Sequence, residues 1–212
     1  MRPAAVAAAL PVVPRCFSGE TVVCVASGPS LTPDDVTYCR GRARVLVVKD
    51  AIRLAPWADV LFGSGADAGH WWKRNGPSLT GFAGARYTLD PAAAEWATVL
   101  RHNGPTGLST DPTTLRTGKN SGYAAINLAA LLGAAKIVLL GYDLTPAPDG
   151  KDRWFGAHPW QTMPWSVLGQ IVAPIYATLV QPLADLGIEI VNASRQTALT
   201  CFPRQSITEA LA

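Results

Sequence analysis

Charged residues are scarce in this chain of 212 residues: 16% are Asp, Glu, Lys or Arg, and 18 basic against 15 acidic side chains leave a formal charge of +3. So small an excess of positive charge does not predict nucleic-acid binding by itself. Long hydrophobic runs are missing too. Although the mean hydropathy is +0.17, no stretch reaches the roughly 18 apolar residues that a membrane-spanning helix needs. The apolar residues are spread over many short runs, as in a buried α/β core.

Cysteine and histidine are also few, with four and three residues. No two cysteines form a C-x-x-C pair, and no histidine stands at zinc-ligand spacing from two of them, which argues against a zinc motif and a disulfide framework. Cys24 lies inside an apolar run, so we interpret it as a core residue. We expect four reduced structural thiols in a cytoplasmic protein.

The N-terminal residues 1–18 are rich in alanine and proline. One arginine followed by an alanine-rich run loosely imitates a secretion signal, but Pro3, Pro11 and Pro14 interrupt the run and a strand-like segment follows soon after. We therefore predict an arm over residues 1–18 that lies on a single domain formed by residues 19–212. A secretion signal is the alternative.

Short apolar runs alternate with helical segments along the rest of the chain. The runs predict strands at 21–26, 44–48, 59–62, 136–140 and 188–191, with weaker candidates at 85–88 and 98–100. Helices are expected after Thr32, over 123–132 with Gly133 as its cap, over 164–186 with a kink or split at its prolines, and over 203–211. Strands that are apolar throughout indicate a mainly parallel sheet covered on both faces. The predicted fold class is a single three-layer, Rossmann-like α/β domain.

In such folds ligands bind beyond the carboxyl ends of the strands. The first strand is followed by Ser27, Gly28, Pro29 and Ser30. Glycine allows close approach of the backbone, and two hydroxyls stand near a helix N-terminus, which is typical of an anion or nucleotide site. The loop is neither G-x-G-x-x-G nor Walker A, so a dinucleotide dehydrogenase and a P-loop NTPase both lose support. A tight turn without a ligand is the alternative.

A second candidate loop opens the strongest predicted helix with Lys119, Asn120, Ser121 and Gly122. The first turn of a helix carries N–H groups without intrahelical partners and the positive end of the helix dipole. A helix cap alone needs only one of these residues. We therefore favour a ligand site over a simple cap.

Two residues are candidates for catalysis. Asp143 ends a buried strand, where an acid is uncommon without a partner. His158 follows an aromatic loop, and histidine is the usual general base for a hydroxyl group. A structural imidazole is the alternative for His158.

Further polar and aromatic residues follow other strands. Asp50 and Asp67 come after the second and third strands, and Asn192 and Ser194 come after the last. Trp71, one of two adjacent tryptophans, is a candidate for stacking on a base or a sugar ring, although core packing is the commoner role.

The segments Val25–Leu31, Asn120–Gly122 and Ile137–Asp143, in this order, resemble a broad Rossmann-like superfamily. It includes the bacterial CMP-sialic-acid-dependent sialyltransferases and proteins similar to 6-hydroxymethylpterin diphosphokinase. The segments Phe155–Pro159 and Asn192–Ser194 look more like uncharacterised phage and prophage members. The resemblance runs from about residue 20 to the C-terminus.

The likeness to the sialyltransferases implies a metal-independent glycosyltransferase without a cofactor, whose donor is a nucleotide-activated sugar such as a CMP-sugar. The resemblance assigns the nucleotide phosphates and ribose to Ser27, Gly28, Ser30, Asn120, Ser121 and Gly122. It makes His158 the base that deprotonates an acceptor hydroxyl and puts Asn192 and Ser194 near the donor. The acceptor stays open between a glycan, a metabolite and modified DNA, and homo-oligomerisation stays open as well.

The chain departs from that family at three places. Ala26-Ser27 replaces the start of its first loop, Lys49-Asp50 stands where the family commonly has Asn, and Pro159 follows the histidine where the family has Ser. The pterin diphosphokinase likeness implies a different use of the same loops, with a nucleoside triphosphate at the Asn120 helix start and Mg²⁺ held by Asp143 or Asp67. A third reading is a non-catalytic module that binds a nucleotide or a sugar.

Overall fold

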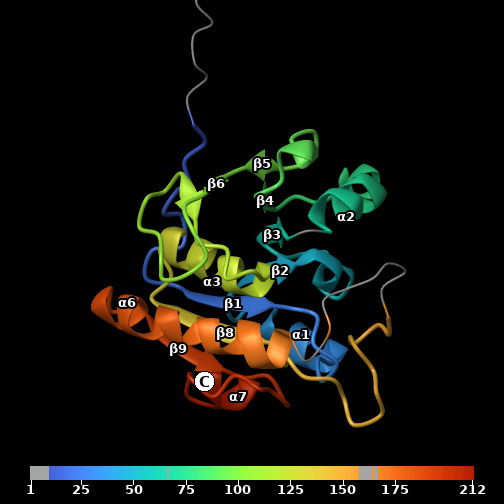
Figure 1. The fold of residues 1–212 in the computed structure, drawn as a ribbon, viewed down its shortest axis with the longest axis vertical. Helices are drawn as coiled ribbons and strands as arrows, with labels where there is room; N and C mark the ends of the chain where they lie inside the picture. The colour runs from blue at the N-terminus through green and yellow to red at the C-terminus, as the bar shows by residue number, and fades with distance from the viewer. Residues whose placement is uncertain (1–9, 66, 158–163, 165–166) are drawn as a thin grey trace, which may run out of the picture.

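The computed structural model describes residues 10–65, 67–157, 164 and 167–212. Its centre is a sheet of seven parallel strands in the order β5-β4-β3-β2-β1-β8-β9 (Figure 1). The strands are β1 (Thr21–Val25), β2 (Arg44–Val48), β3 (Val60–Gly63), β4 (Ala85–Thr88), β5 (Thr98–Val99), β8 (Lys136–Leu140) and β9 (Glu189–Asn192). The predicted α/β fold with a mainly parallel sheet is confirmed, and both weaker strand candidates are strands.

Successive residues of the central strands enter two separate apolar cores on opposite faces of the sheet. Val22 and Cys24 of β1 pack in the core that contains the side chains of α3 (Ser121–Leu131). Val23 and Val25 pack in the other core, which is covered by α1 (Pro33–Cys39), α2 (Ala68–Asn75) and α7 (Ile207–Ala210). This burial on both faces explains why the strands are apolar throughout. The sheet is the middle of three layers, as predicted.

The predicted helix 164–186 is divided into short pieces. They are a π-helical turn η4 (Leu168–Val172), α5 (Ala173–Ile175), a 3₁₀ turn η5 (Tyr176–Leu179) and α6 (Val180–Asp185). Pro174 stands at the start of α5. Proline has no N–H group, so it cannot donate the hydrogen bond that one continuous helix would need at this position. The expected split is thus confirmed.

Several short elements complete the fold. They are the 3₁₀ turns η1 (Lys49–Arg53), η2 (Gly76–Leu79) and η3 (Pro91–Ala93), and a second sheet of two parallel strands, β6 (Arg101–His102) and β7 (Thr114–Leu115). Two-residue strands carry no readable periodicity, so the sequence did not predict this sheet. The predicted caps are confirmed: Thr32 accepts a hydrogen bond from the N–H of Asp35, and Gly133 has a φ of 100° after α3.

Residues 10–18 lie against the domain. The N–H of Val13 donates to the carbonyl of Pro112, and the N–H of Phe17 donates to that of Leu132, with N–O distances of 2.9 and 2.8 Å. Both side chains are buried in the core that contains α3. Within the described ranges, no helix combines the length and apolarity that crossing a bilayer requires.

Candidate functional site

A cavity of about 240 Å³ lies where the carboxyl ends of β1, β2, β3 and β8 meet the N-terminus of α3. β1 pairs with β2 on one side and with β8 on the other, so the chain reverses its direction of progress across the sheet at this point, which is where open α/β sheets bind ligands. The polar and glycine residues in its wall include Ser27, Gly28, Lys49, Asp50, Ser64, Asp67, Lys119, Asn120, Ser121, Gly122, Tyr142, Asp143 and Arg153.

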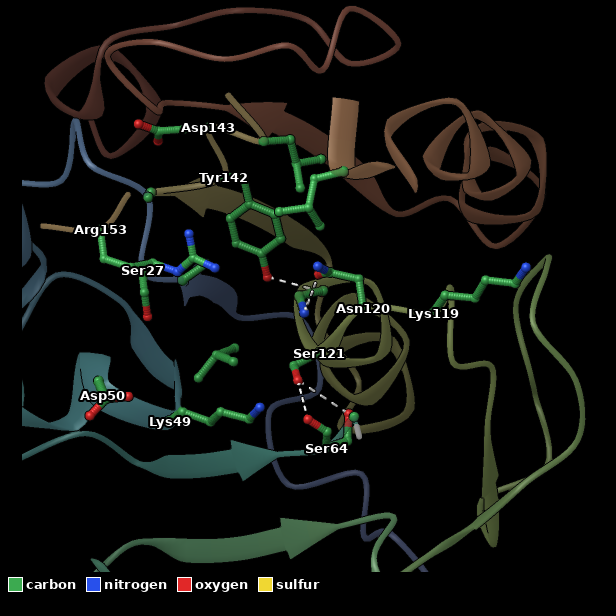
Figure 2. A pocket seen from close by; sticks show the side chains of 18 of the residues that line it. Ser27, Lys49, Asp50, Ser64, Lys119, Asn120, Ser121, Tyr142, Asp143 and Arg153 are labelled. Atoms are coloured by element: carbon green, nitrogen blue, oxygen red, sulfur yellow. Dashed lines mark hydrogen bonds between the residues drawn. The ribbon is translucent and has the colours of Figure 1, made fainter. Parts of the chain in front are cut away.

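Two basic side chains extend into this pocket (Figure 2). The Nζ of Lys49 lies 2.5 Å from Oδ1 of Asp67, and only 11% of the lysine side chain is exposed. Burial lowers the pKa of Lys49, and the charge of Asp67 opposes this. Burial also lowers the pKa of Arg153, whereas four carboxylates, those of Asp50 and Asp143 among them, raise it. Lys119 lines the rim, and its side chain points away from the centre of the pocket in Figure 2.

The N-terminus of α3 is held firmly at the wall of the pocket. Oδ1 of Asn120 accepts hydrogen bonds from the N–H of Gly122 at 2.8 Å and from the hydroxyl of Tyr176 at 2.9 Å. The hydroxyl of Ser121 donates to the carbonyl of Ser64 at 2.5 Å, which ties the helix to the end of β3. Because the first turn of a helix has N–H groups without intrahelical acceptors and a positive dipole end, this wall suits an anion.

Asp143 is a buried acid with one unused oxygen. It is 1% exposed, and its Oδ2 accepts a hydrogen bond from the N–H of Ser30 at 2.7 Å. Its Oδ1 is buried and has no hydrogen-bond partner among the described residues. Burial raises the pKa of Asp143 to about 6, against the lowering effect of the bonds from Ser30. A carboxylate with this pKa can accept or release a proton near neutral pH.

Gly28 is required by its contact with this carboxylate. A Cβ at residue 28 would lie 2.2 Å from Oδ1 of Asp143 and 2.6 Å from the carbonyl oxygen of Gly141. No side chain fits there. The sequence signal for Gly28 was close approach of a ligand to the backbone, and the structure adds close approach of Asp143.

Backbone strain is concentrated around the pocket. In the described part of the chain three non-glycine residues have a positive φ: Lys49 at 48°, Lys119 at 55° and Leu144 at 50°. All three line the pocket. Such conformations cost of order 1–3 kcal/mol each and are typical of functional sites.

The structure brings together part of the predicted set. Ser27, Gly28, Asp50, Asp67, Lys119, Asn120, Ser121, Gly122 and Asp143 all line the pocket, whereas Pro29, Ser30, Trp71, Asn192 and Ser194 do not. Ser30 acts on the pocket indirectly, through its bond to Asp143. His158, the predicted base, lies outside the described residues.

The structure corrects the prediction that Trp71 stacks on a ligand. The side chain is 0% exposed and packs in the core on the α2 face of the sheet. Its indole Nε1 donates to Oδ2 of Asp50 at 3.0 Å, so Trp71 orients a pocket carboxylate. The ring cannot reach a ligand because α2 turns it towards the sheet.

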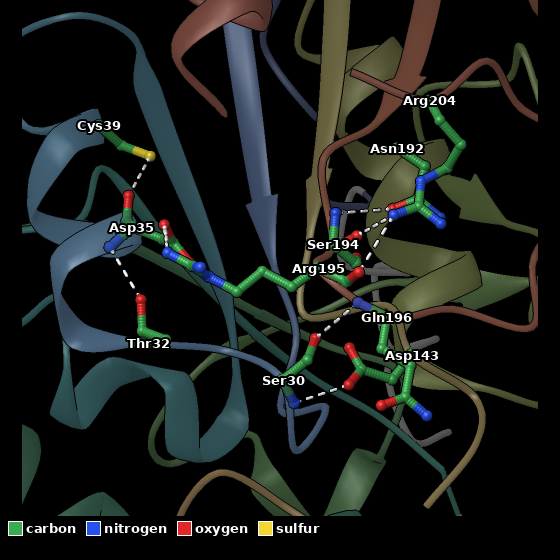
Figure 3. A network of polar contacts seen from close by, with 10 residues as sticks. All are labelled: Ser30, Thr32, Asp35, Cys39, Asp143, Asn192, Ser194, Arg195, Gln196 and Arg204. Carbon is green, nitrogen blue, oxygen red and sulfur yellow. Dashed lines mark hydrogen bonds and ion pairs between the residues drawn. The ribbon is translucent and has the colours of Figure 1, made fainter. Parts of the chain in front are cut away.

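Asn192, the last residue of β9, and Ser194 belong to a polar network that also contains Ser30 and Asp143 (Figure 3). The hydroxyl of Ser194 accepts a hydrogen bond from the N–H of Tyr142 at 2.7 Å, and Oδ1 of Asn192 accepts one from the N–H of Ser194 at 3.0 Å. Both are buried. The N–H of Gln196 donates to the hydroxyl of Ser30, which links this segment to the first loop. Asn192 and Ser194 were predicted to contact a nucleotide. In the structure they do not line the pocket, and their side chains hold the backbone next to it.

Sequence reasoning missed several residues of the pocket, namely Lys49, Ser64, Tyr142, Arg153 and Tyr176. Lys49, Ser64 and Tyr142 had a signal, because each follows a predicted strand within two residues. Arg153 belongs to a loop far from any strand end and carried no local signal.

The described residues include no group of three or more His, Cys, Asp or Glu side chains placed to hold a metal ion. No protein-family model matches the chain. A comparison with the curated proteins gives no match either. The chemistry of the pocket itself is therefore the basis for a function.

Proposed function

We propose that this pocket binds the phosphate of a nucleotide-activated sugar, such as a CMP-sugar, and that the protein transfers the sugar to an acceptor hydroxyl without a metal ion. The observation that carries the proposal is the convergence of Lys49, Arg153 and the N-terminus of α3 on one cavity at the carboxyl edge of the sheet. Buried cations beside a helix N-terminus are a favourable setting for phosphate. Asp143, whose Oδ1 has no hydrogen-bond partner among the described residues, lines the same cavity.

Asp143 supplies the proton acceptor among the described residues. With a pKa of about 6, it is about nine-tenths ionised at pH 7. In the proposed reaction the acceptor oxygen bonds to the anomeric carbon and its proton passes to Asp143. The bond from that carbon to the phosphate oxygen breaks, and the nucleotide phosphate keeps the electron pair. The resemblance gives the proton to His158 instead, and the two assignments differ in the variant that loses activity.

The test is a thermal-shift screen with CMP, UMP, ADP, ATP and GTP, each with and without Mg²⁺, followed by turnover of the matching nucleotide-sugar. We expect stabilisation by CMP or a CMP-sugar that EDTA does not remove. Asp143→Asn and His158→Ala, assayed in parallel, identify the base by which of them lowers kcat. Stabilisation without turnover of any nucleotide-sugar would leave a binding module, and the absence of any nucleotide shift would refute the proposal.

An Mg²⁺-dependent phosphotransferase is the second candidate, favoured by the unused oxygen of Asp143. Mg²⁺ at nucleotide sites is commonly held by one or two carboxylates together with substrate phosphates. Asp143 is the carboxylate that would hold such an ion, because Asp67 is engaged by Lys49. The bound ion would neutralise phosphate charge. A shift with ATP or GTP that requires Mg²⁺, together with no shift by CMP, would favour this candidate.

A further inference from the structure

Lys49 is built into the pocket in a way that a surface lysine is not. It is the first residue after β2, its φ is 48°, and its side chain is nearly buried. The positive φ belongs to a residue type that seldom adopts it. Such a strained backbone persists only when the surrounding structure holds it in place.

The ammonium group of Lys49 has hydrogen-bonding capacity to spare. An ammonium has three N–H donors, and among the described residues only Asp67 accepts a hydrogen bond from it. Its surroundings include the start of α3: a Cβ built on Gly65 would lie 3.5 Å from Oδ1 of Asp67, 3.7 Å from Oγ of Ser121 and 4.0 Å from Nζ of Lys49. The ammonium, its carboxylate and the first residue of α3 therefore surround one point.

A purely structural ion pair does not account for this placement. Removing two charges from water carries a desolvation penalty that their attraction often fails to recover, and apolar residues of similar size stabilise a core as well. The pair lines the same cavity as the N-terminus of α3. An anion in that cavity would use the remaining donors and would be attracted by the helix dipole as well.

We propose that Lys49 binds the phosphate that leaves with the nucleotide and that Asp67 is a positioning residue that orients the ammonium group. The inference rests on the proposed glycosyl transfer and assigns its leaving-group subsite. When the bond between the anomeric carbon and the phosphate oxygen breaks, the electron pair stays on that oxygen. Lys49 keeps its proton and stabilises the added negative charge, so it contributes more to the transition state than to the bound donor.

The experiment uses the full chain with Lys49→Met, Lys49→Arg and Asp67→Asn. Lys136→Met is the matched control, since Lys136 forms an ion pair with Glu189 at the other end of the sheet. Binding of CMP, UMP, GMP and AMP is measured by calorimetry and thermal shift, and nucleotide-sugar hydrolysis gives kcat and KM. We expect Lys49→Met to weaken binding of the nucleoside monophosphate at least tenfold and to lower kcat more than it raises KM. Lys49→Arg should retain part of both, and Lys136→Met should stay within twofold of wild type.

Asp67→Asn tests the positioning role by a pH profile. The charged groups around Lys49 are Asp67 and Asp50, which raise its pKa, and Arg153, which lowers it together with burial. Without the charge of Asp67 the pKa of Lys49 falls further, so the basic limb of the kcat profile should move to lower pH. A structural role alone would leave that limb in place.

The outcomes separate the two proposals. A wild-type protein that shows no nucleotide shift overturns glycosyl transfer, and the subsite with it. A wild type that binds a nucleoside monophosphate, together with a folded Lys49→Met that binds it within twofold, overturns the subsite alone. If Lys49→Met does not fold, Lys49→Arg and Asp67→Asn decide: unchanged kcat and an unmoved pH profile in both would contradict the assignment.

Discussion

Replacement of Gly28 by alanine tests the architecture of the pocket most directly. The new Cβ would lie 2.2 Å from Oδ1 and 2.4 Å from Cγ of Asp143, and 2.6 Å from the carbonyl oxygen of Gly141. All three separations are far below van der Waals contact. The carboxylate is confined by burial and by its bond to Ser30, and the carbonyl belongs to the backbone. A small movement of these atoms therefore cannot relieve the clash.

The cost follows from these contacts. Overpacking a filled site costs typically 1–3 kcal/mol, and a backbone atom among the clashing partners puts Gly28→Ala at the upper end, about 3 kcal/mol. For a chain of this size that corresponds to a fall in Tm of roughly 6–12 °C. Because native proteins are stable by only about 5–15 kcal/mol, this is a large share of the total.

Urea unfolding monitored by tryptophan fluorescence measures the free energy of unfolding. Gly81→Ala is the control, since a Cβ at Gly81 meets no atom within 4 Å and is expected to change stability by less than about 0.5 kcal/mol. The double mutant with Asp143→Ala removes two of the three close contacts of the new Cβ, so Gly28→Ala should cost at least about 1 kcal/mol less in that background. Equal stability of Gly28→Ala and Gly81→Ala would refute the reasoning.

Two further changes probe buried polar groups. Because burial raises the folded-state pKa of Asp143 to about 6 from its ordinary 3.8, its contribution to stability is greatest below pH 3.8 and is lost as the pH rises through 6. Asp143→Asn should therefore be more stable than wild type at pH 8 by roughly 2–3 kcal/mol, with the gain vanishing near pH 4; identical pH dependence of Tm in the two proteins would contradict this. Asn127→Ala removes the fully buried side-chain oxygen that accepts from the N–H groups of Ser109 and Arg116. We expect a loss of about 3 kcal/mol in urea unfolding, and little loss from Asn75→Ala at a more exposed helix end; equal costs would count against the network.

The parallel sheet, and the edge of the sheet at which the cavity lies, could be predicted from the sequence. Val22–Val25 and Ile137–Leu140 are apolar without interruption, and such runs report burial on both faces from local composition alone. Residues that follow the strands, such as Gly28, or that begin α3, such as Ser121, line one cavity because the geometry of parallel strands brings these ends together.

The side-chain directions could not be predicted. Lys49 and Asp50 are neighbours in the sequence, and both line the pocket, yet Lys49 pairs with Asp67 whereas Asp50 accepts a hydrogen bond from the indole of Trp71. Arg153 reaches the pocket from a loop whose N–H at Trp154 bonds to the carbonyl of Ser27, a contact between residues far apart in the chain. No local pattern encodes either fact.

By itself, the amino-acid sequence determined where the strands run and which loops gather at one edge, since hydrophobic periodicity is a local property. The tertiary structure decided which polar side chains face the cavity. Trp71, Asn192 and Ser194 stand close to strand ends in the sequence, yet their side chains bond to other groups of the protein. Trp71 donates to Asp50, Ser194 accepts from the N–H of Tyr142, and Asn192 accepts from the N–H of Ser194. A buried polar group takes whichever partner the packed neighbours leave within reach, and those neighbours come from segments that meet only when the chain is folded.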